Sequence, residues 1–322
     1  MQLADILNLI KDDFQSVDQL IQEQLASRVP LVEKIADYIV NSGGKRIRPL
    51  LVLLTAKALD QSGPDTVKLA TVIEFLHTAT LLHDDVVDVS DMRRGNQTAN
   101  AKWGNAPSVL VGDFLYSRSF EMMVELANLE VMKILSRTTS IIAEGEVLQL
   151  TNVKNPKVTE AQYMTVIQGK TAQLFEASTE GAATLLGTSA EVRESLRRYG
   201  QLLGLAFQLV DDVLDYEGDS EELGKNVGDD LAEGKPTLPL IHAMANADDE
   251  GRALVRQAIR KGGLDDMDAV MAVLKSCGSI QYTREKALEW AAEAKQSLNC
   301  LADSDAKTAL AALADIAVAR TK

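Results

Sequence analysis

The stretch HTATLLHDDVVDVSDMRRG, residues 77–95, decides how the rest of the chain is interpreted. It begins as an apolar helical run and ends in three carboxylates, Asp84, Asp85 and Asp88, followed by two arginines. Residues four apart share a helix face, so Asp84 and Asp88 point the same way, with Asp85 beside them. Carboxylates this close repel one another, and a hard divalent cation such as Mg²⁺ would remove the repulsion. The alternative is a solvated acidic helix end, although the helix dipole disfavours anions at a C-terminus.

The composition indicates an all-helical protein. Of the 322 residues, 46% are hydrophobic and only 4% aromatic, and long alternating β-branched runs are missing. The formal charge of −14 argues against nucleic acid or an anionic membrane surface as the main partner. No apolar run reaches about 18 residues and no signal peptide is visible, so we expect no transmembrane segment. The two cysteines, Cys277 and Cys300, fit idle thiols in a reducing, cytoplasmic environment.

A second group of charges follows two glycines. Residues 43–49 read GGKRIRP, with Lys45, Arg46 and Arg48 at the entrance of a helix that Pro49 would open. Glycines allow a close backbone approach, and cations at a helix entrance suit phosphate. The P-loop pattern is missing, so the choice lies between another kind of anion site and an ordinary basic turn. In a chain this acidic, we favour the anion site.

Long helices are expected to deliver the remaining candidates. We predict helices over residues 64–89, 159–186 and 189–217, the second of which carries Lys170 and Thr171. The third ends in FQLVDDVLDY, where Asp211, Asp212 and Asp215 repeat the spacing of the first three aspartates.

A polar connection, residues 218–236, follows the second acidic motif and contains Lys225 and Lys235. A loop of this length is usually functional or disordered, and we predict a mobile active-site loop. Residues 237–322 have the pattern of further amphipathic helices. Because the two acidic motifs need each other, we predict a single domain over residues 1–322.

The two acidic motifs indicate more together than either does alone. If they faced each other, six carboxylates would meet at the mouth of a cavity, and several cations would be needed there. Those cations would in turn attract an anion, for which a diphosphate is suited, while the apolar helices behind would accommodate a hydrocarbon chain. A prenyl diphosphate combines both parts.

On these residues the chain resembles the trans-polyprenyl diphosphate synthases, in their long-chain bacterial branch. The matching motifs are GGKRIRP (43–49), HTATLLHDDVVD (77–88), DMRRG (91–95), GKT (169–171), FQLVDDVLDY (207–216) and GKNVGDDLAEGKPTLPL (224–240). The resemblance implies an orthogonal bundle of long helices around a central cavity (the isoprenoid synthase type), a homodimer, and about two to three Mg²⁺ ions per active site.

The resemblance also implies the reaction. Isopentenyl diphosphate would be condensed repeatedly onto an allylic diphosphate such as farnesyl diphosphate, by ionisation, condensation and elimination. The product would be all-trans and of octaprenyl (C40) length, made for the side chain of a respiratory quinone. Whether so apolar a product brings the chain to a membrane stays open.

The resemblance assigns roles position by position. Mg²⁺ would be bound by Asp84, Asp88 and Asp211, with Asp85, Asp212 and Asp215 close by. Isopentenyl diphosphate would be bound by Lys45, Arg48, His77 and Arg94. The allylic diphosphate would be bound by Arg93, Lys170, Thr171, Gln208, Lys225 and Lys235. The catalytic residues would be Lys170 and the six aspartates. The candidates for limiting product length are Ala79, Thr80, Leu76 and Met123.

The chain-length candidates come from two arguments that differ. In the family, a bulky residue five positions before the first aspartate limits growth, and here that residue is the small Ala79. A helical wheel instead places Thr80 and Leu76 nearer the aspartate face.

Other functions share some of these features. A shorter-chain (C15–C20) synthase would share the motifs. A class I terpene cyclase usually has an Asn/Ser/Glu-type second metal motif and does not need GGKRIRP. A dimetal four-helix protein would need two Glu-x-x-His motifs, of which Glu74 to His77 supplies one. A non-catalytic subunit would normally lack one aspartate motif, and a helical scaffold would leave the clustered charges unexplained.

Overall fold

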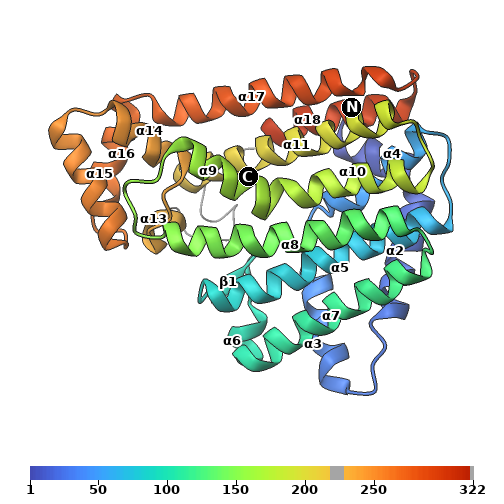
Figure 1. Cartoon of the computed structure of the whole chain (residues 1–322). Helices are drawn as coiled ribbons and strands as arrows, with labels where there is room; N and C mark the ends of the chain where they lie inside the picture. The colour runs from blue at the N-terminus through green and yellow to red at the C-terminus, as the bar shows by residue number, and fades with distance from the viewer. Residues whose placement is uncertain (218–227, 320–322) are drawn as a thin grey trace. The chain divides into compact units, whose positions relative to one another are not determined.

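The computed structural model describes residues 1–217 and 228–319, and these are almost entirely helical (Figure 1). The predicted all-helical fold is confirmed, with one exception, a hairpin of two short strands, β1 (Met92–Arg93) and β2 (Asn96–Gln97). The chain divides into two compact units. Unit 1 contains residues 1–139, 174–200 and 297–313, and unit 2 contains residues 140–173, 201–296 and 314–322. The single-domain organisation therefore stays a prediction.

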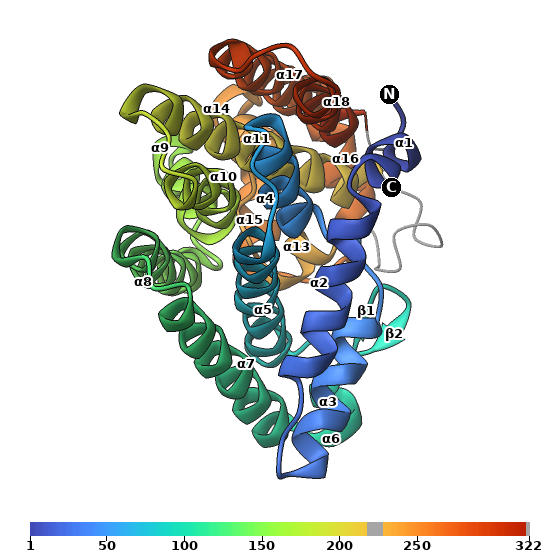
Figure 2. The same ribbon diagram turned by 90° about the vertical axis from the view of Figure 1, so that its right-hand side faces the viewer.

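Unit 1 is built around α5 (Pro64–Val87), which begins at a proline in the first helical position as predicted. Eleven consecutive positions from Thr66 are buried with one exception, so this helix has an apolar surface on nearly all sides and needs neighbours around it. It packs against α2 (Lys11–Gln24), α4 (Ile47–Ala58) and α7 (Asn105–Glu125), as Figure 2 shows. The other elements of unit 1 are α1 (Leu3–Leu9), α3 (Pro30–Asn41), α6 (Ala99–Trp103), α10 (Gln173–Leu185) and η2 (Leu298–Cys300).

Unit 2 has its own apolar core. Its elements are α9 (Glu160–Ile167), η1 (Gln168–Ala172), α13 (Asp229–Glu233), α14 (Leu238–Asn246), α15 (Asp249–Lys261), α16 (Met267–Ser276) and α17 (Ser279–Ser297). Three helices contribute several residues to each unit, namely α8 (Leu129–Asn152), α11 (Ala190–Glu217) and α18 (Asp305–Val318). In unit 2, α14 packs against α9, α15 and α16. The helices predicted after residue 237 are confirmed.

The helix predicted over residues 159–186 is interrupted by the π-helical turn η1. Here α8 comes very close, because a Cβ atom at Gly145 would lie 2.7 Å from the backbone nitrogen of Lys170. A π turn inserts one residue without ending the helix, so the apolar periodicity of the sequence does not reveal it. The consequence is local, since η1 carries Lys170 and Thr171.

The connection predicted over residues 218–236 is only partly described. Residues 218–227, with Lys225, lie outside the described residues. The described remainder contains the short helix α13, flanked by Gly228 and Gly234 at φ values of +86° and +76°. Within residues 1–217 and 228–319, no helix combines the length and apolar character needed to cross a membrane.

Candidate active site

One face of α5 remains partly exposed, and the predicted site residues of this helix lie on it. His77, Thr80, Asp84 and Asp88 are half-buried and follow one another at intervals of three or four residues, which is the spacing of one helix face. Ala79, by contrast, is completely buried. Leu76 and Met123, the other chain-length candidates, are also buried, at 1% exposure each.

Asp85 points away from that face and binds Arg93. It is completely buried, and its Oδ1 accepts from both Nε and Nη2 of Arg93 at 2.7 Å. Burial raises the pKa of Asp85, and the hydrogen bond from Arg93 partly offsets this. Its Oδ2 is buried without a hydrogen-bond partner. Asp85 therefore orients Arg93, while Asp84 and Asp88 occupy the exposed face.

Arg48 and His77 form a half-buried pair beside the aromatic ring of Phe175. Arg48 Nη1 lies 3.2 Å from His77 Nε2, and the guanidinium sits 4.5 Å from the ring centroid. Because arginine can only donate, His77 Nε2 must accept, which puts the ring proton on Nδ1. Burial, and then the neighbouring Arg48, lower the pKa of His77 well below 6.5, so the ring is neutral.

This pair predicts how stability depends on pH. The unfolded chain binds a proton at His77 below about pH 6.5, whereas the folded chain does not, so folding stability falls as the pH is lowered through that value. We expect the free energy of unfolding of the wild type to lose about 1 kcal/mol more than that of His77→Gln between about pH 7.5 and 5.5. Urea unfolding of both proteins at the two pH values measures the difference. Parallel pH profiles would contradict a neutral His77.

The cationic surroundings of this pair contain unsatisfied polar atoms. Glu74 lies one turn before His77, and burial raises its pKa, although the nearby arginines Arg46, Arg48 and Arg94 lower it. Arg48 Nε is buried without a hydrogen-bond partner, and burial lowers the pKa of Arg48 to about 10. A buried cationic donor without a partner favours an anionic ligand.

The two glycines of GGKRIRP hold Arg94 close to the backbone. Gly43 and Gly44 have φ values of +90° and +136°, a region that glycine adopts readily. Arg94 Nη1 donates to the Gly43 carbonyl, and a Cβ atom on Gly44 would lie 2.4 Å from the same nitrogen. Lys45 next to them is exposed. The turn therefore places Arg94 beside the basic segment that the sequence singled out.

A hairpin that the sequence analysis missed fixes the two arginines. Arg94 and Gly95 form the turn between β1 and β2 with φ values of +52° and +75°. Tyr38 donates from its hydroxyl to the Gln97 carbonyl at 2.7 Å, and Lys102 lies 4.2 Å above the Tyr38 ring. An Arg-Gly pair between polar residues was the available signal for this turn, but it is weak without the usual Asn or Asp.

The aspartates of the second motif, in unit 2, also differ in exposure. Asp211 is half-buried, whereas Asp212 and Asp215 are 1% and 6% exposed. Asp212 accepts from the Tyr163 hydroxyl and, at 2.9 Å, from Gln208 Nε2. Burial, and then the nearby Asp230, raise the pKa of Asp212 to about 8. Asp211 is thus the member of this motif that is presented at the surface of the unit.

The predicted basic and polar residues of unit 2 that the structure describes make three contacts. Lys170 Nζ donates to Glu146 Oε2 at 2.7 Å, and Thr171 donates from its hydroxyl to Gln208 Oε1 at 2.8 Å. Lys235 pairs with Glu233. The structure therefore brings Thr171, Gln208 and Asp212 together.

The aspartates fit a divalent metal through the chemistry of their oxygens. Asp84 and Asp88 stand one turn apart on the same half-buried face, as two carboxylate ligands of one hard cation would. In the described part of the chain, however, no three His, Cys, Asp or Glu side chains are grouped closely enough to hold a metal by themselves. This fits mutual repulsion, since Asp85 and Asp212 are instead directed at Arg93 and Tyr163.

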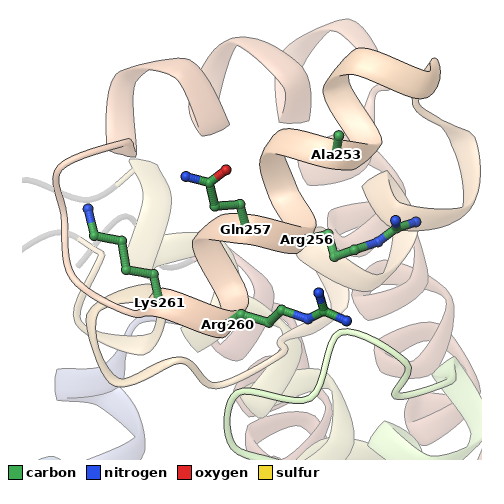
Figure 3. Close-up of a pocket in the computed structure, with 5 residues that line it drawn as sticks. All are labelled: Ala253, Arg256, Gln257, Arg260 and Lys261. Atoms are coloured by element: carbon green, nitrogen blue, oxygen red, sulfur yellow. The ribbon is translucent and has the colours of Figure 1, made fainter.

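A surface hollow on α15 is separate from these residues. It is lined by Ala253, Arg256, Gln257, Arg260 and Lys261, which all belong to this one helix (Figure 3). Two of its cations lie in the last turn, where the helix dipole favours positive charge, and Lys261 pairs with Asp265 at 2.7 Å. The hollow contains none of the predicted site residues.

Comparison with known proteins identifies the family. Residues 29–276 match the family model described as polyprenyl synthetase. The chain belongs to this family. It is 51% identical to the octaprenyl diphosphate synthase of Escherichia coli (strain K12), with 100% of both chains covered. It is also 48% identical to an all-trans-nonaprenyl-diphosphate synthase (geranyl-diphosphate specific) of Rhodobacter capsulatus, with 98% of this chain and 97% of that relative covered.

Solved structures agree with this result. A polyprenyl synthase from Caulobacter crescentus CB15, complexed with calcium and isoprenyl diphosphate, matches with a TM-score of 0.96 at 42% identity, over 100% of this chain and 98% of that one. A decaprenyl diphosphate synthase from Rhodobacter capsulatus matches with a TM-score of 0.95 at 44% identity, over 100% of both. The predicted family, fold type and enzyme class, a trans-prenyltransferase, are confirmed. Polyprenyl synthases use a divalent metal.

Proposed function

We propose that this long-chain trans-prenyl diphosphate synthase makes octaprenyl diphosphate from farnesyl diphosphate and isopentenyl diphosphate. The observation that carries the product length is the 51% identity over the whole chain to an octaprenyl diphosphate synthase. The half-buried face of α5 supports the chemistry, because it presents two carboxylates and His77 beside three arginines. A role in quinone side-chain synthesis and a cytoplasmic location stay predictions.

We assign the allylic diphosphate to the aspartates and to the polar residues of unit 2. Asp84, Asp88 and Asp211 would hold about two to three Mg²⁺ ions, which when bound polarise the diphosphate as a leaving group. Lys170 and Arg93 place positive charge where the leaving group gains negative charge, and Thr171 and Gln208 orient it by hydrogen bonding. Lys235 and Lys225 complete the set, with Lys225 outside the described residues.

We assign isopentenyl diphosphate to the basic residues of unit 1. Arg48 and Arg94 supply fixed cationic donors, Lys45 an exposed one, and the neutral His77 ring donates from Nδ1 while Nε2 stays bound to Arg48. Loss of the allylic diphosphate leaves a carbocation, which the double bond of isopentenyl diphosphate attacks. A proton then leaves for the released diphosphate, and the reaction requires that water be kept from the cation, which it would trap.

The assignment predicts an effect of Gly44→Ala. The new Cβ would occupy the place of the Arg94 guanidinium, so Arg94 must move away from its position. We expect the KM for isopentenyl diphosphate to rise about tenfold, because one charge-assisted contact is lost, while the KM for farnesyl diphosphate is retained. Steady-state kinetics with each substrate varied in turn measures the two KM values.

Gly43→Ala is the matched control for this experiment. It also places a Cβ at a positive φ, +90°, and so adds backbone strain, but no atom lies within 4 Å of its added Cβ. An equal rise in KM for both variants would show that strain, and not the displacement of Arg94, is responsible.

The overall function is tested by a single incubation. The purified chain is mixed with farnesyl diphosphate, radiolabelled isopentenyl diphosphate and Mg²⁺, and the extracted products are sized. We expect octaprenyl diphosphate and loss of incorporation on addition of a chelator. Absence of incorporation, or incorporation that is insensitive to chelator, would reject the reaction. A geranylgeranyl product would keep the reaction and reject the proposed length.

We further propose that the chain is a homodimer. Large apolar side chains of unit 1 are exposed on α7 and at the start of α8, namely Leu110 at 65%, Val124 at 64% and Leu129 at 76%. Apolar groups this exposed on neighbouring parts of the chain favour association with a second copy. Light scattering coupled to size-exclusion chromatography should give twice the chain mass of 34.9 kDa, and a mass of one chain would reject the dimer.

A further inference from the structure

A chain of three hydrogen bonds in unit 2 starts at Tyr163, a residue that none of the motifs contains. The Tyr163 hydroxyl donates to Asp212 Oδ2, Gln208 Nε2 donates to Asp212 Oδ1 at 2.9 Å, and the Thr171 hydroxyl donates to Gln208 Oε1 at 2.8 Å. The residues come from α9, η1 and α11. The hydrogen bonds therefore tie together three elements that carry the allylic side of the proposed site.

The direction of every bond in this chain is fixed by chemistry when Asp212 is ionised, because a carboxylate can only accept. Tyr163 is 5% exposed, and burial with the nearby Asp212 carboxyl raises its pKa well above 10, so its hydroxyl remains a donor. Asp212 accepts one bond on each oxygen, which leaves the amide nitrogen of Gln208 as the donor. The amide oxygen of Gln208 must then accept from Thr171. Rotating the amide by half a turn would place its oxygen against an oxygen of the Asp212 carboxylate, and two acceptors cannot form a hydrogen bond.

The orientation of Gln208 matters because of where it lies on α11. Gln208 and Asp211 are both half-buried and three residues apart, so they share the exposed face of that helix. The Gln208 amide nitrogen has a second N–H. Because the first N–H donates to Asp212, the network fixes the direction of the second N–H, which can donate to a diphosphate oxygen. Thr171 follows Lys170 directly in η1 and is fixed by the same amide.

The apolar setting of Tyr163 holds the start of the network in place. Its ring packs in the cluster formed with Ile167, Leu209 and Leu214. Residues that orient metal ligands typically change metal affinity or activity by about 10–100-fold when they are lost, and we expect a comparable effect for the residues that orient Gln208. Asp212 is thereby held in the interior, between the tyrosine and the amide.

We propose that Tyr163 is a positioning residue for the allylic substrate. Through Asp212 it orients the Gln208 amide and the Thr171 hydroxyl toward the diphosphate. The inference rests on the proposed function only in taking an allylic diphosphate as the ligand of Gln208 and Thr171. Tyr163 itself does not touch the substrate.

Tyr163→Phe removes the hydroxyl and keeps the ring in the apolar cluster. We expect the dissociation constant of farnesyl diphosphate in the presence of Mg²⁺, measured by calorimetry without isopentenyl diphosphate, to rise about tenfold. The KM for farnesyl diphosphate should rise in parallel, while the KM for isopentenyl diphosphate stays within about twofold.

Tyr199→Phe is the matched control. Tyr199 lies on α11, is completely buried and donates from its hydroxyl to the Leu310 carbonyl at 2.7 Å, outside the network. Its loss removes a comparable buried hydrogen bond, so a purely structural effect should appear equally in both variants. Similar calorimetric dissociation constants for the two variants would overturn the proposal.

Two substitutions at the far end of the network give an independent test. Thr171→Ser keeps the hydroxyl and should bind farnesyl diphosphate within about threefold of the wild type, whereas Thr171→Val should weaken binding about tenfold. If Tyr163 and Thr171 act through one network, the double variant Tyr163→Phe/Thr171→Val should be weakened by less than the product of the two single effects. Multiplying effects would overturn the proposal, as would Thr171→Ser as weak as Thr171→Val. A wild type that neither binds nor elongates farnesyl diphosphate would instead reject the proposed function.

Discussion

Asp84→Asn is expected to lower the kcat for incorporation of isopentenyl diphosphate by at least about 10³-fold. Asn keeps the shape of the side chain but removes the negative charge, and with it a strong oxygen ligand for Mg²⁺. Asp84 is suited to this role because it lies half-buried on the open face of α5 together with Asp88, whereas Asp85 is turned to Arg93. Single-turnover incorporation of radiolabelled isopentenyl diphosphate measures the effect on chemistry separately from product release.

A matched control separates loss of the ligand from loss of charge. Asp65→Asn removes an exposed carboxylate from the other end of the same helix and should leave kcat within about twofold, at a stability cost of about 0.5 kcal/mol from the helix dipole. Raising the Mg²⁺ concentration should recover part of the Asp84→Asn activity and change nothing for Asp65→Asn. If Asp84→Asn retains near wild-type turnover, Asp84 does not bind the catalytic metal.

Much of this site could be predicted because its geometry is local. The spacing of Asp84 and Asp88, and of Gln208 and Asp211, places each pair on one face of a helix, whatever else the chain does. The apolar run before Asp84 predicts a buried central helix, and Pro64 marks its start. These features depend on a few neighbouring residues, which the sequence gives directly.

The remaining features depend on contacts between residues that are distant in the sequence. Nothing near Asp212 in the sequence points to Tyr163, which lies 49 positions away. The partner of Arg94 is likewise the Gly43 carbonyl, 51 positions away. The π-helical turn at Lys170 accompanies the close approach of Gly145 from another helix. Sequence motifs therefore identify which residues take part, but their orientation follows from packing that motifs do not encode.

The same distinction decides which residue on α5 should control product length. Thr80 shares the half-buried face with His77 and Asp84 and lies about 6 Å from Asp84 along the helix axis. Ala79 is completely buried in the packing of α5. A hydrocarbon chain growing from a diphosphate at Asp84 would pass the exposed face first, so Thr80 is the better placed of the two candidates.

Thr80→Tyr is accordingly expected to shift the main product from octaprenyl to geranylgeranyl diphosphate or shorter, because the ring would stand in the path of the growing chain. Sizing the radiolabelled products by reversed-phase chromatography measures the shift. Thr80→Val, which keeps the volume and removes the hydroxyl that donates to the His77 carbonyl, should leave the length unchanged. Thr80→Tyr with octaprenyl as its main product would show that the growing chain does not pass this face of α5.

Ala79→Tyr distinguishes the two chain-length arguments directly. If the exposed face of α5 controls product length, a ring added at this buried position overpacks the core and lowers the free energy of unfolding by about 1–3 kcal/mol. The product that this variant still makes would then have its full length. If instead the position five residues before the first aspartate decides, Ala79→Tyr shortens the product and Thr80→Tyr does not. The pair of variants thus assigns the control of length to one side of α5, because neighbouring residues on a helix point about 100° apart.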